Sequence, residues 1–188
     1  MISPGKTSSD WPLLDPSQRR RAWAAWLEVV FQDRDSEAAG RSTTAGLFVP
    51  SPLSDLRPLF DQIDLAAYKR MADLGSGDGR VVLLAALYTD AEGLEADPAL
   101  VAASRGCALA LGISRARFAR IDFQTADLKK YDLLFIYPDK PLGPLTDRLT
   151  RDFAGDLLVY GPFPSAGDLK ETARFDLKFN QARLFRRG

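Results

Sequence analysis

The amino-acid sequence predicts an α/β protein with five parallel strands followed by a C-terminal antiparallel hairpin. Two observations support this fold class. From residue 70 onward, short apolar runs alternate with helical stretches, the pattern of a parallel sheet covered by helices on both faces. Near the end of the chain, residues 174–179 and 182–187 both look like strands and lie too close together for a crossover helix. They are therefore expected to pair antiparallel, joined at Asn180-Gln181.

The elements of the sheet region follow one another in a regular order. Asp97 is expected to cap the helix that follows the second strand, with Pro98 at its first position. The predicted helices on either side of it cover 80–87 and 142–153. The predicted parallel strands are 70–74, 91–95, 116–121, 131–137 and 156–160.

Residues 1–46 are predicted to be an N-terminal tail with one amphipathic helix at 17–32, and residues 47–188 to be the binding domain. Apolar side chains at helical spacing mark one face of that helix: Trp23, Trp26, Leu27, Val30 and Phe31. We expect this face to pack against the domain, the alternative being a lid over a cleft. A further helix is expected from an N-cap at Ser54 to about Ile63.

The composition excludes several classes of function. Lysine plus arginine and aspartate plus glutamate number 25 each, so the chain lacks the basic excess of a protein that coats nucleic acid. It has no histidine and one cysteine, which excludes a Ser-His-Asp triad and disfavours a zinc site. No apolar run reaches the ~20 residues that a membrane span needs. We expect a cytoplasmic protein without a bound metal.

The segment DLGSGDGR, residues 73–80, is the main candidate for ligand binding. It follows a strand and opens a helix, where α/β sheets bind nucleotides, and its glycines allow close approach of the backbone. The dinucleotide fingerprint is G-x-G-x-x-G, whereas this loop has G-x-G-x-G. Asp78 would repel a pyrophosphate by several kcal/mol at ~4 Å. S-adenosylmethionine (SAM) carries an ammonium and a sulfonium instead, so Asp73 and Asp78 would attract it.

Two further acids follow at the ends of the next strands. Glu95 lies about twenty residues after Gly75, where a carboxylate can accept hydrogen bonds from both ribose hydroxyls. Asp122 ends the third strand, where an acid can accept from the adenine amino group, and Phe123 could lie on the ring. The alternative for Asp122 is that it is only a cap or turn residue. The expected cofactor contacts are Asp73, Gly75, Ser76, Gly77, Asp78, Glu95, Asp122 and Phe123.

The loop resembles motif I of the class I SAM-dependent methyltransferases, whose Rossmann-like sheet has its last strand inserted antiparallel. Over residues 47–187 the chain is similar to the small lysine methyltransferases of mitochondrial carriers and the ATP synthase c subunit. The resemblance rests on FVPSP, DLGSGDGRVVLLAA, GLEADPALVAASR and DFQTADLKKYDLLFIYP. It implies SAM contacts at Asp73, Gly75, Gly77, Glu95 and Asp122, and it implies that FVPSP packs over the cofactor.

The residues after the fourth strand depart from both related patterns. The lysine-methyltransferase family usually has an apolar residue, Pro and Gln there, and amino-methyltransferases of nucleic acids have Asp or Asn, Pro, Pro and an aromatic residue. This chain has Tyr137-Pro138-Asp139. We expect Tyr137 and the Pro138 carbonyl to orient the methyl acceptor and Asp139 to assist proton removal. The alternatives are that Tyr137 only ends the strand and that Asp139 is only a solvated loop residue.

These residues together predict a SAM-dependent methyltransferase acting on a protein side chain, with lysine as the first candidate. Three alternatives stay open: methylation of RNA, methylation of a small molecule, and a SAM-binding module without turnover. A nucleic-acid partner is not favoured. The runner-up with another cofactor is a nicotinamide-dependent dehydrogenase.

Overall fold

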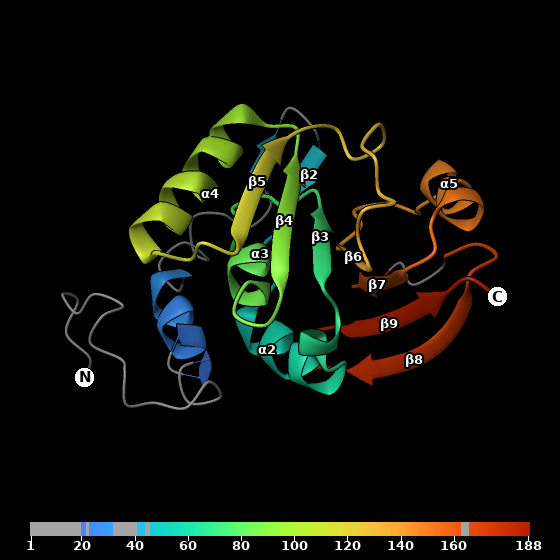
Figure 1. The fold of residues 1–188 in the computed structure, drawn as a ribbon, viewed down its shortest axis with the longest axis horizontal. Helices are drawn as coiled ribbons and strands as arrows, with labels where there is room; N and C mark the ends of the chain where they lie inside the picture. Colours follow the sequence, from blue (N-terminus) through green and yellow to red (C-terminus); the bar gives the residue numbers. More distant parts are fainter. Residues whose placement is uncertain (1–19, 22, 32–40, 44–45, 163–165) are drawn as a thin grey trace.

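A seven-stranded sheet organises the chain, with strand order β5-β4-β3-β6-β7-β9-β8 (Figure 1). The computed structural model describes residues 20–21, 23–31, 41–43, 46–162 and 166–188. Strands β3 to β7 pair in parallel, and β9 is inserted antiparallel between β7 and β8. The predicted parallel sheet with a C-terminal antiparallel hairpin is confirmed. The strands are β3 (Arg70–Leu74), β4 (Asp90–Glu95), β5 (Ala116–Arg120), β6 (Leu133–Ile136), β7 (Asp156–Tyr160), β8 (Lys170–Asp176) and β9 (Gln181–Arg186).

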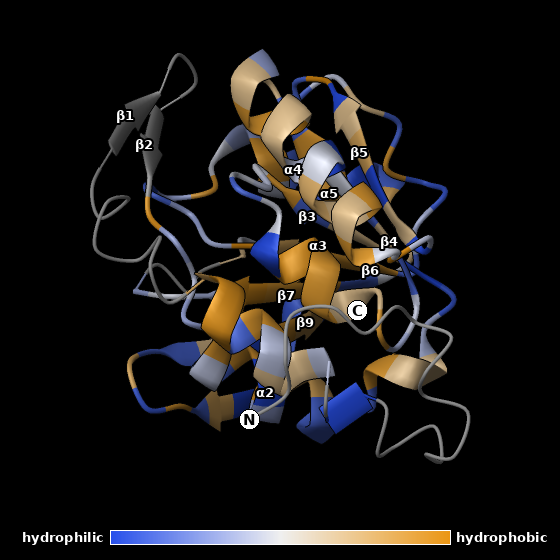
Figure 2. Ribbon diagram, turned by 90° about the vertical axis from the view of Figure 1, so that its left-hand side faces the viewer, coloured by the Kyte–Doolittle hydropathy of each residue, from blue (hydrophilic) through white to orange (hydrophobic). Residues whose placement is uncertain are grey.

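Helices cover both faces of this sheet and enclose two apolar clusters. One cluster joins α2, α3 and α4 to the sheet, and Figure 2 shows the α3 ribbon mostly in the colour of hydrophobic residues. The other joins α5 and the segment before β6 to the opposite face. The helices are α2 (Leu53–Gln62), the short 3-10 helix η2 (Leu65–Ala67), α3 (Arg80–Ala85), α4 (Pro98–Leu111) and α5 (Pro144–Asp152). A separate two-stranded sheet pairs β1 (Arg41–Thr43) with β2 (Gly46–Phe48).

The N-terminal helical residues pack against the first of these clusters, as expected. Helix is present at 20–21 and 23–31, and Leu27 and Phe31 are buried in the cluster. Trp23 and Trp26 are half-buried, with their rings edge to face at 5.5 Å. The predicted tail at 1–16 lies outside the described residues, so the division of the chain at residue 46 stays a prediction.

Capping of α4 was predicted correctly, but the start of α2 was not. The Asp97 carboxylate accepts hydrogen bonds from two amides in the first turn of α4, with Pro98 at the first position. For α2 the N-cap is Pro52 rather than Ser54, and no side chain caps this helix. Pro52 has a φ of −61°, and its carbonyl accepts the first hydrogen bonds of the helix.

The C-terminal hairpin also turns earlier than predicted. β8 ends at Asp176 and β9 already begins at Gln181, so the turn occupies 177–180. The cause is a distant carboxylate: Asp55 on α2 accepts hydrogen bonds from the backbone amides of Phe179 and Asn180, both at 3.2 Å. No local signal in the hairpin reports this partner.

Candidate active site

The candidate site lies at the carboxyl end of the sheet, where β3 separates the two halves of its strand order. β4 lies on one side of β3 and β6 on the other, so the connections from these strands leave in opposite directions. Such a point opens a crevice outside the carboxyl ends of the strands. The DLGSGDGR loop follows β3 directly and runs into α3 at Arg80.

Close packing shapes this loop. Gly79 has a φ of +82°, and a Cβ atom there would lie 2.7 Å from the Phe118 ring. Gly93 on β4 leaves room for Ser76, because a Cβ atom at Gly93 would lie 2.4 Å from the Ser76 hydroxyl oxygen. That buried hydroxyl has no hydrogen-bond partner among the described residues. Glycine is therefore required at both positions for steric reasons.

Glu95 ties the loop to the end of β4. Its carboxylate is 6% exposed and accepts hydrogen bonds from the amides of Gly77 and Asp97, each at 2.9 Å. Each carboxylate oxygen has two lone pairs, so capacity remains for a ligand hydroxyl. The structure brings Glu95 to the glycine loop, which the sequence spacing predicts.

Asp73 is the most perturbed group of the site. Its side chain is 4% exposed, and none of the described residues donates a hydrogen bond to its carboxylate. Burial, followed by the charges of Glu95 and Asp78, raises the pKa of Asp73 well above its ordinary value. The charge of such a carboxylate is not offset by the described residues, so Asp73 is the candidate of this site for pairing with a cation.

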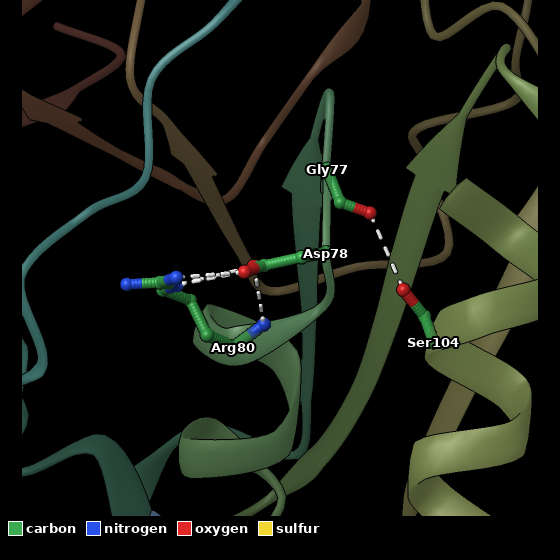
Figure 3. Close-up of polar contacts among 4 residues, drawn as sticks. All are labelled: Gly77, Asp78, Arg80 and Ser104. Carbon is green, nitrogen blue, oxygen red and sulfur yellow. Dashed lines mark hydrogen bonds and ion pairs between the residues drawn. The ribbon is translucent and has the colours of Figure 1, made fainter. Parts of the chain in front are cut away.

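Asp78 has a partner that the sequence interpretation did not foresee. Its carboxylate binds the Arg80 guanidinium through Nε and Nη2, with the shortest contact at 2.8 Å (Figure 3). Arg80 is 2% exposed, and its guanidinium lies 4.9 Å from the centre of the Phe31 ring. The protein itself thus offsets the Asp78 charge, which leaves Asp73 and Glu95 as the carboxylates of the loop region without an ion pair to a described residue. Figure 3 also shows the Ser104 hydroxyl donating to the Gly77 carbonyl at 3.3 Å.

Asp122 and Phe123, which follow Ile121 after the end of β5, differ in their surroundings. The half-buried Phe123 ring lies 3.8 Å from the position of a Cβ atom on Gly75, so it borders the loop. Asp122 is exposed, and its carboxylate accepts from the Gln124 amide at 2.8 Å, which is a turn-forming contact. Arg148 of α5 holds this turn by donating to three backbone carbonyls, those of Phe123, Gln124 and Ala126. No sequence signal identified Arg148.

The residues after β6 form a wall at the same edge of the sheet. Tyr137 is half-buried and meets the Tyr160 ring edge to face, with centroids 4.9 Å apart. It also packs on Gly161, where a Cβ atom would lie 2.5 Å from the Tyr137 ring. Pro138 is buried and Asp139 is exposed. Tyr137 is therefore fixed by packing, whereas Asp139 is free to meet a molecule from solvent.

A buried network supports this wall. Asp55 is 0% exposed and accepts a hydrogen bond from the Tyr160 hydroxyl at 2.8 Å, besides those from the turn between β8 and β9. Burial, with the Asp55 carboxylate beside it, raises the pKa of Tyr160. Sequence analysis missed Asp55, because an acid in the first turn of a helix is ordinary there.

A hollow of about 400 Å³ opens beside the wall. Its lining comes from the end of β7 and from the β8–β9 turn with its flanking residues. Within the described part of the chain, no group of three or more Cys, Asp or Glu side chains is arranged to hold a metal ion. None of the described helices is long and apolar enough to cross a bilayer.

Comparison with known proteins finds similarity in structure. No protein-family profile and no curated protein sequence matches the chain. An RNA methyltransferase from Salinibacter ruber, solved with S-adenosyl-L-homocysteine, is 26% identical with a TM-score of 0.62, over 73% of this chain and 93% of that one. The protein yhhF from Escherichia coli is 17% identical with a TM-score of 0.58, over 70% of this chain and 84% of that one. A mutant of MtNAS in complex with S-adenosylmethionine is 15% identical with a TM-score of 0.62, over 92% and 77%.

Proposed function

We propose that this chain, which has the Rossmann-like fold of the SAM-dependent methyltransferases, methylates an amine of a protein side chain, with lysine as the first candidate. The fold supports methyl transfer from SAM. The methyl acceptor and the roles of individual residues are the proposal.

The observation that carries the proposal is the set of carboxylates around the glycine loop. Asp73, Asp78 and Glu95 are three buried acids, and among the described residues Arg80 is the cation that pairs with one of them. An excess of negative charge remains, and the Asp73 carboxylate receives no hydrogen bond from the described residues. This site suits a ligand that is positively charged and has no phosphate, and SAM is such a ligand.

The residues of the chain divide the work of binding. In this proposal Asp73 pairs with the cationic part of SAM, Glu95 accepts hydrogen bonds from the ribose, and Phe123 covers the adenine ring. When bound, SAM supplies an activated methyl group, and its departure leaves a neutral thioether. The cofactor contacts of Gly75, Gly77 and Asp122 are proposed on their position in the loop and at the end of β5.

The residues after β6 would prepare the acceptor. An amine attacks through its lone pair, so a lysine ammonium must first lose a proton. Asp139 is exposed in the segment after β6 and is proposed to receive it, while Tyr137 and the Pro138 carbonyl orient the amine. The fixed Tyr137 ring supports a positioning role, since its contacts with Tyr160 and Gly161 hold it in one place.

RNA methylation is the second candidate. One observation favours it: the structural neighbour with 26% identity is an RNA methyltransferase. The segment after β6 argues against amino methylation of a base, because Tyr137-Pro138-Asp139 lacks the Asp or Asn, Pro, Pro and aromatic residue of enzymes with that activity.

Two measurements test the proposal in sequence. Isothermal titration calorimetry with SAM is expected to show binding by the native chain and weakened binding by Asp73→Asn. A cell lysate is then incubated with the native chain and tritiated SAM, and the label is measured in protein, RNA and small molecules. Label in RNA alone would replace lysine by the second candidate, and no SAM binding at all would remove both.

Asp139→Asn tests the proton step separately. The variant is expected to keep SAM affinity and to lose turnover, because its amide cannot accept the proton. The Tyr137→Phe variant serves as a comparison, since it keeps the ring packing. An unchanged rate in Asp139→Asn would exclude Asp139 from the mechanism.

A further inference from the structure

The hollow lies beside Tyr137, which the proposed function makes part of the acceptor site. Gly161 lines the hollow, and Gly161 is also the residue on which the Tyr137 ring packs. The other lining residues belong mainly to the β8–β9 turn, at the same carboxyl edge of the sheet, because β9 starts beside the end of β7. A substrate bound in the hollow therefore lies next to the acceptor wall.

The turn that forms this hollow is held firmly. The buried Asp55 carboxylate accepts from the amides of Phe179 and Asn180, and the Asn180 side chain donates to the Tyr160 hydroxyl at 3.2 Å. Hydrogen bonds to a charged, desolvated acceptor are stronger than neutral ones. The hollow is thus a preformed feature of the fold, which lowers the cost of binding.

The hairpin that supplies the turn is basic, although the whole chain is neutral. Residues 170–188 contain six lysines and arginines against two acids. Two of these cations, Lys178 and Arg183, line the hollow together with one acid, Asp176, so its charged side chains sum to a net positive charge. Lys178 is exposed and forms no ion pair with a carboxylate of the described residues.

Arg183 has spare hydrogen-bonding capacity. It lies opposite Arg174 across the hairpin, and the single carboxylate of Glu171 pairs with both guanidinium groups. The Arg183 Nε atom is buried and has no acceptor among the described residues. Such a donor requires an acceptor from a water molecule or a ligand.

We propose that this hollow binds acidic side chains next to the acceptor lysine of a protein substrate, through Lys178 and Arg183. Ammonium and guanidinium groups are the usual partners of carboxylates. The Phe179 side chain is 58% exposed beside Lys178 and offers apolar surface to the same peptide. The inference rests on the proposed function, since it names the substrate class of that site.

A protein is favoured over RNA because few charges are available. Of the six cations of the hairpin, Arg174 and Arg186 are paired with Glu171 and Asp156, and Arg183 shares Glu171 with Arg174. Nucleic-acid binding depends on neutralising several phosphates at once. One or two carboxylates need fewer cations.

The test combines substrate mapping with charge reversal. A lysate incubated with heavy-methyl SAM and the native enzyme is digested, and methylated lysines are located by mass spectrometry. Lysines that gain label are expected to have Asp or Glu within about four positions. Lys178→Glu is expected to slow labelling of these sites by about fivefold or more, the upper range for a partly exposed ion pair.

Lys170→Glu is the matched control. It makes the same charge change on the same hairpin, but at the opposite end of β8 from the turn. There Lys170 lies opposite Arg186 in the β8–β9 strand register. Its labelling rate is expected to stay within about twofold of the native rate. Both variants are first checked for native SAM binding and circular dichroism. Replacing the acids of the mapped substrate by amides should reproduce the loss and remove the effect of Lys178→Glu.

The outcomes separate the two proposals. Labelled lysines without acidic neighbours, or equal rates for the two variants, overturn the docking inference and leave protein methylation standing. Label confined to RNA or small molecules, or no label despite SAM binding, overturns the proposed function, and the docking inference with it.

Discussion

Removing the buried charge of Asp73 is expected to stabilise the free protein while weakening SAM binding. The carboxylate is 4% exposed, receives no hydrogen bond from the described residues, and has Glu95 and Asp78 as charged neighbours. Asp73→Asn keeps the shape of the side chain and removes the charge. The free energy of unfolding should therefore rise while the affinity for SAM falls. This is expected when an unpaired buried charge destabilises the free protein and is offset by the bound ligand.

The size of the gain follows from the cost of a buried group without a partner. Leaving such a group unsatisfied costs about 1–3 kcal/mol, and the amide of the variant retains part of this cost. We expect a gain of about 1–2 kcal/mol in the free energy of unfolding at pH 8. For a chain of this size that corresponds to a rise in Tm of about 2–8 °C.

The pH dependence has a defined sign. The folded chain holds the Asp73 proton at pH values where the unfolded chain has released it, because burial raises the folded pKa. Native stability due to this group therefore falls as pH rises above the unfolded value of about 3.9, until the folded pKa is passed. The variant cannot ionise, so its advantage should be absent below about pH 4 and grow above it.

Thermal denaturation with and without SAM measures both effects. A ligand at 100 times its Kd stabilises the native chain by about 2.7 kcal/mol, and the variant should lose most of this gain. Asp78→Asn is the control with the opposite sign: it breaks a buried ion pair with Arg80 and should destabilise by roughly 3 kcal/mol. If the Tm of ligand-free Asp73→Asn is lower than that of the native protein at pH 8, the Asp73 carboxylate does not destabilise the free protein and the reasoning is refuted.

Three further predictions concern the packing around the site. Gly93→Ala should destabilise by about 1–3 kcal/mol in urea denaturation, because its Cβ atom would lie 2.4 Å from the Ser76 hydroxyl. Gly106→Ala should instead stabilise by roughly 0.5–1 kcal/mol, because nothing lies within 4 Å of a Cβ atom at this position of α4; equal effects of the two changes would refute the steric argument. Asp55→Ala should destabilise by about 3 kcal/mol and couple to Tyr160→Phe by about 1 kcal/mol in a double-mutant cycle, since the two side chains share a hydrogen bond of 2.8 Å. Additive losses would show that this bond contributes nothing.

The contact between the glycine loop and Glu95 could be predicted because its signals are local. The glycine loop follows a strand and opens a helix within one short segment, and Glu95 stands at the end of the next strand. Parallel strands place their carboxyl ends at one edge, so order along the chain becomes proximity in space. The residues after β6 lack such local signals. Tyr137 was identified by its place after β6, but its contacts with Tyr160 and Gly161 depend on a strand that comes later in the chain.

By itself the sequence determined the class of fold and the glycine loop, because apolar periodicity, glycine and helix caps act over a few residues. Only the tertiary structure decided which charges remain available to a ligand. Asp78 forms an ion pair with Arg80, and Asp55 accepts a hydrogen bond from the amide of Phe179, 124 residues later in the chain. Asp73 has no such partner among the described residues. A carboxylate has the same formula in all three places, and its effect depends on the neighbours that folding brings to it.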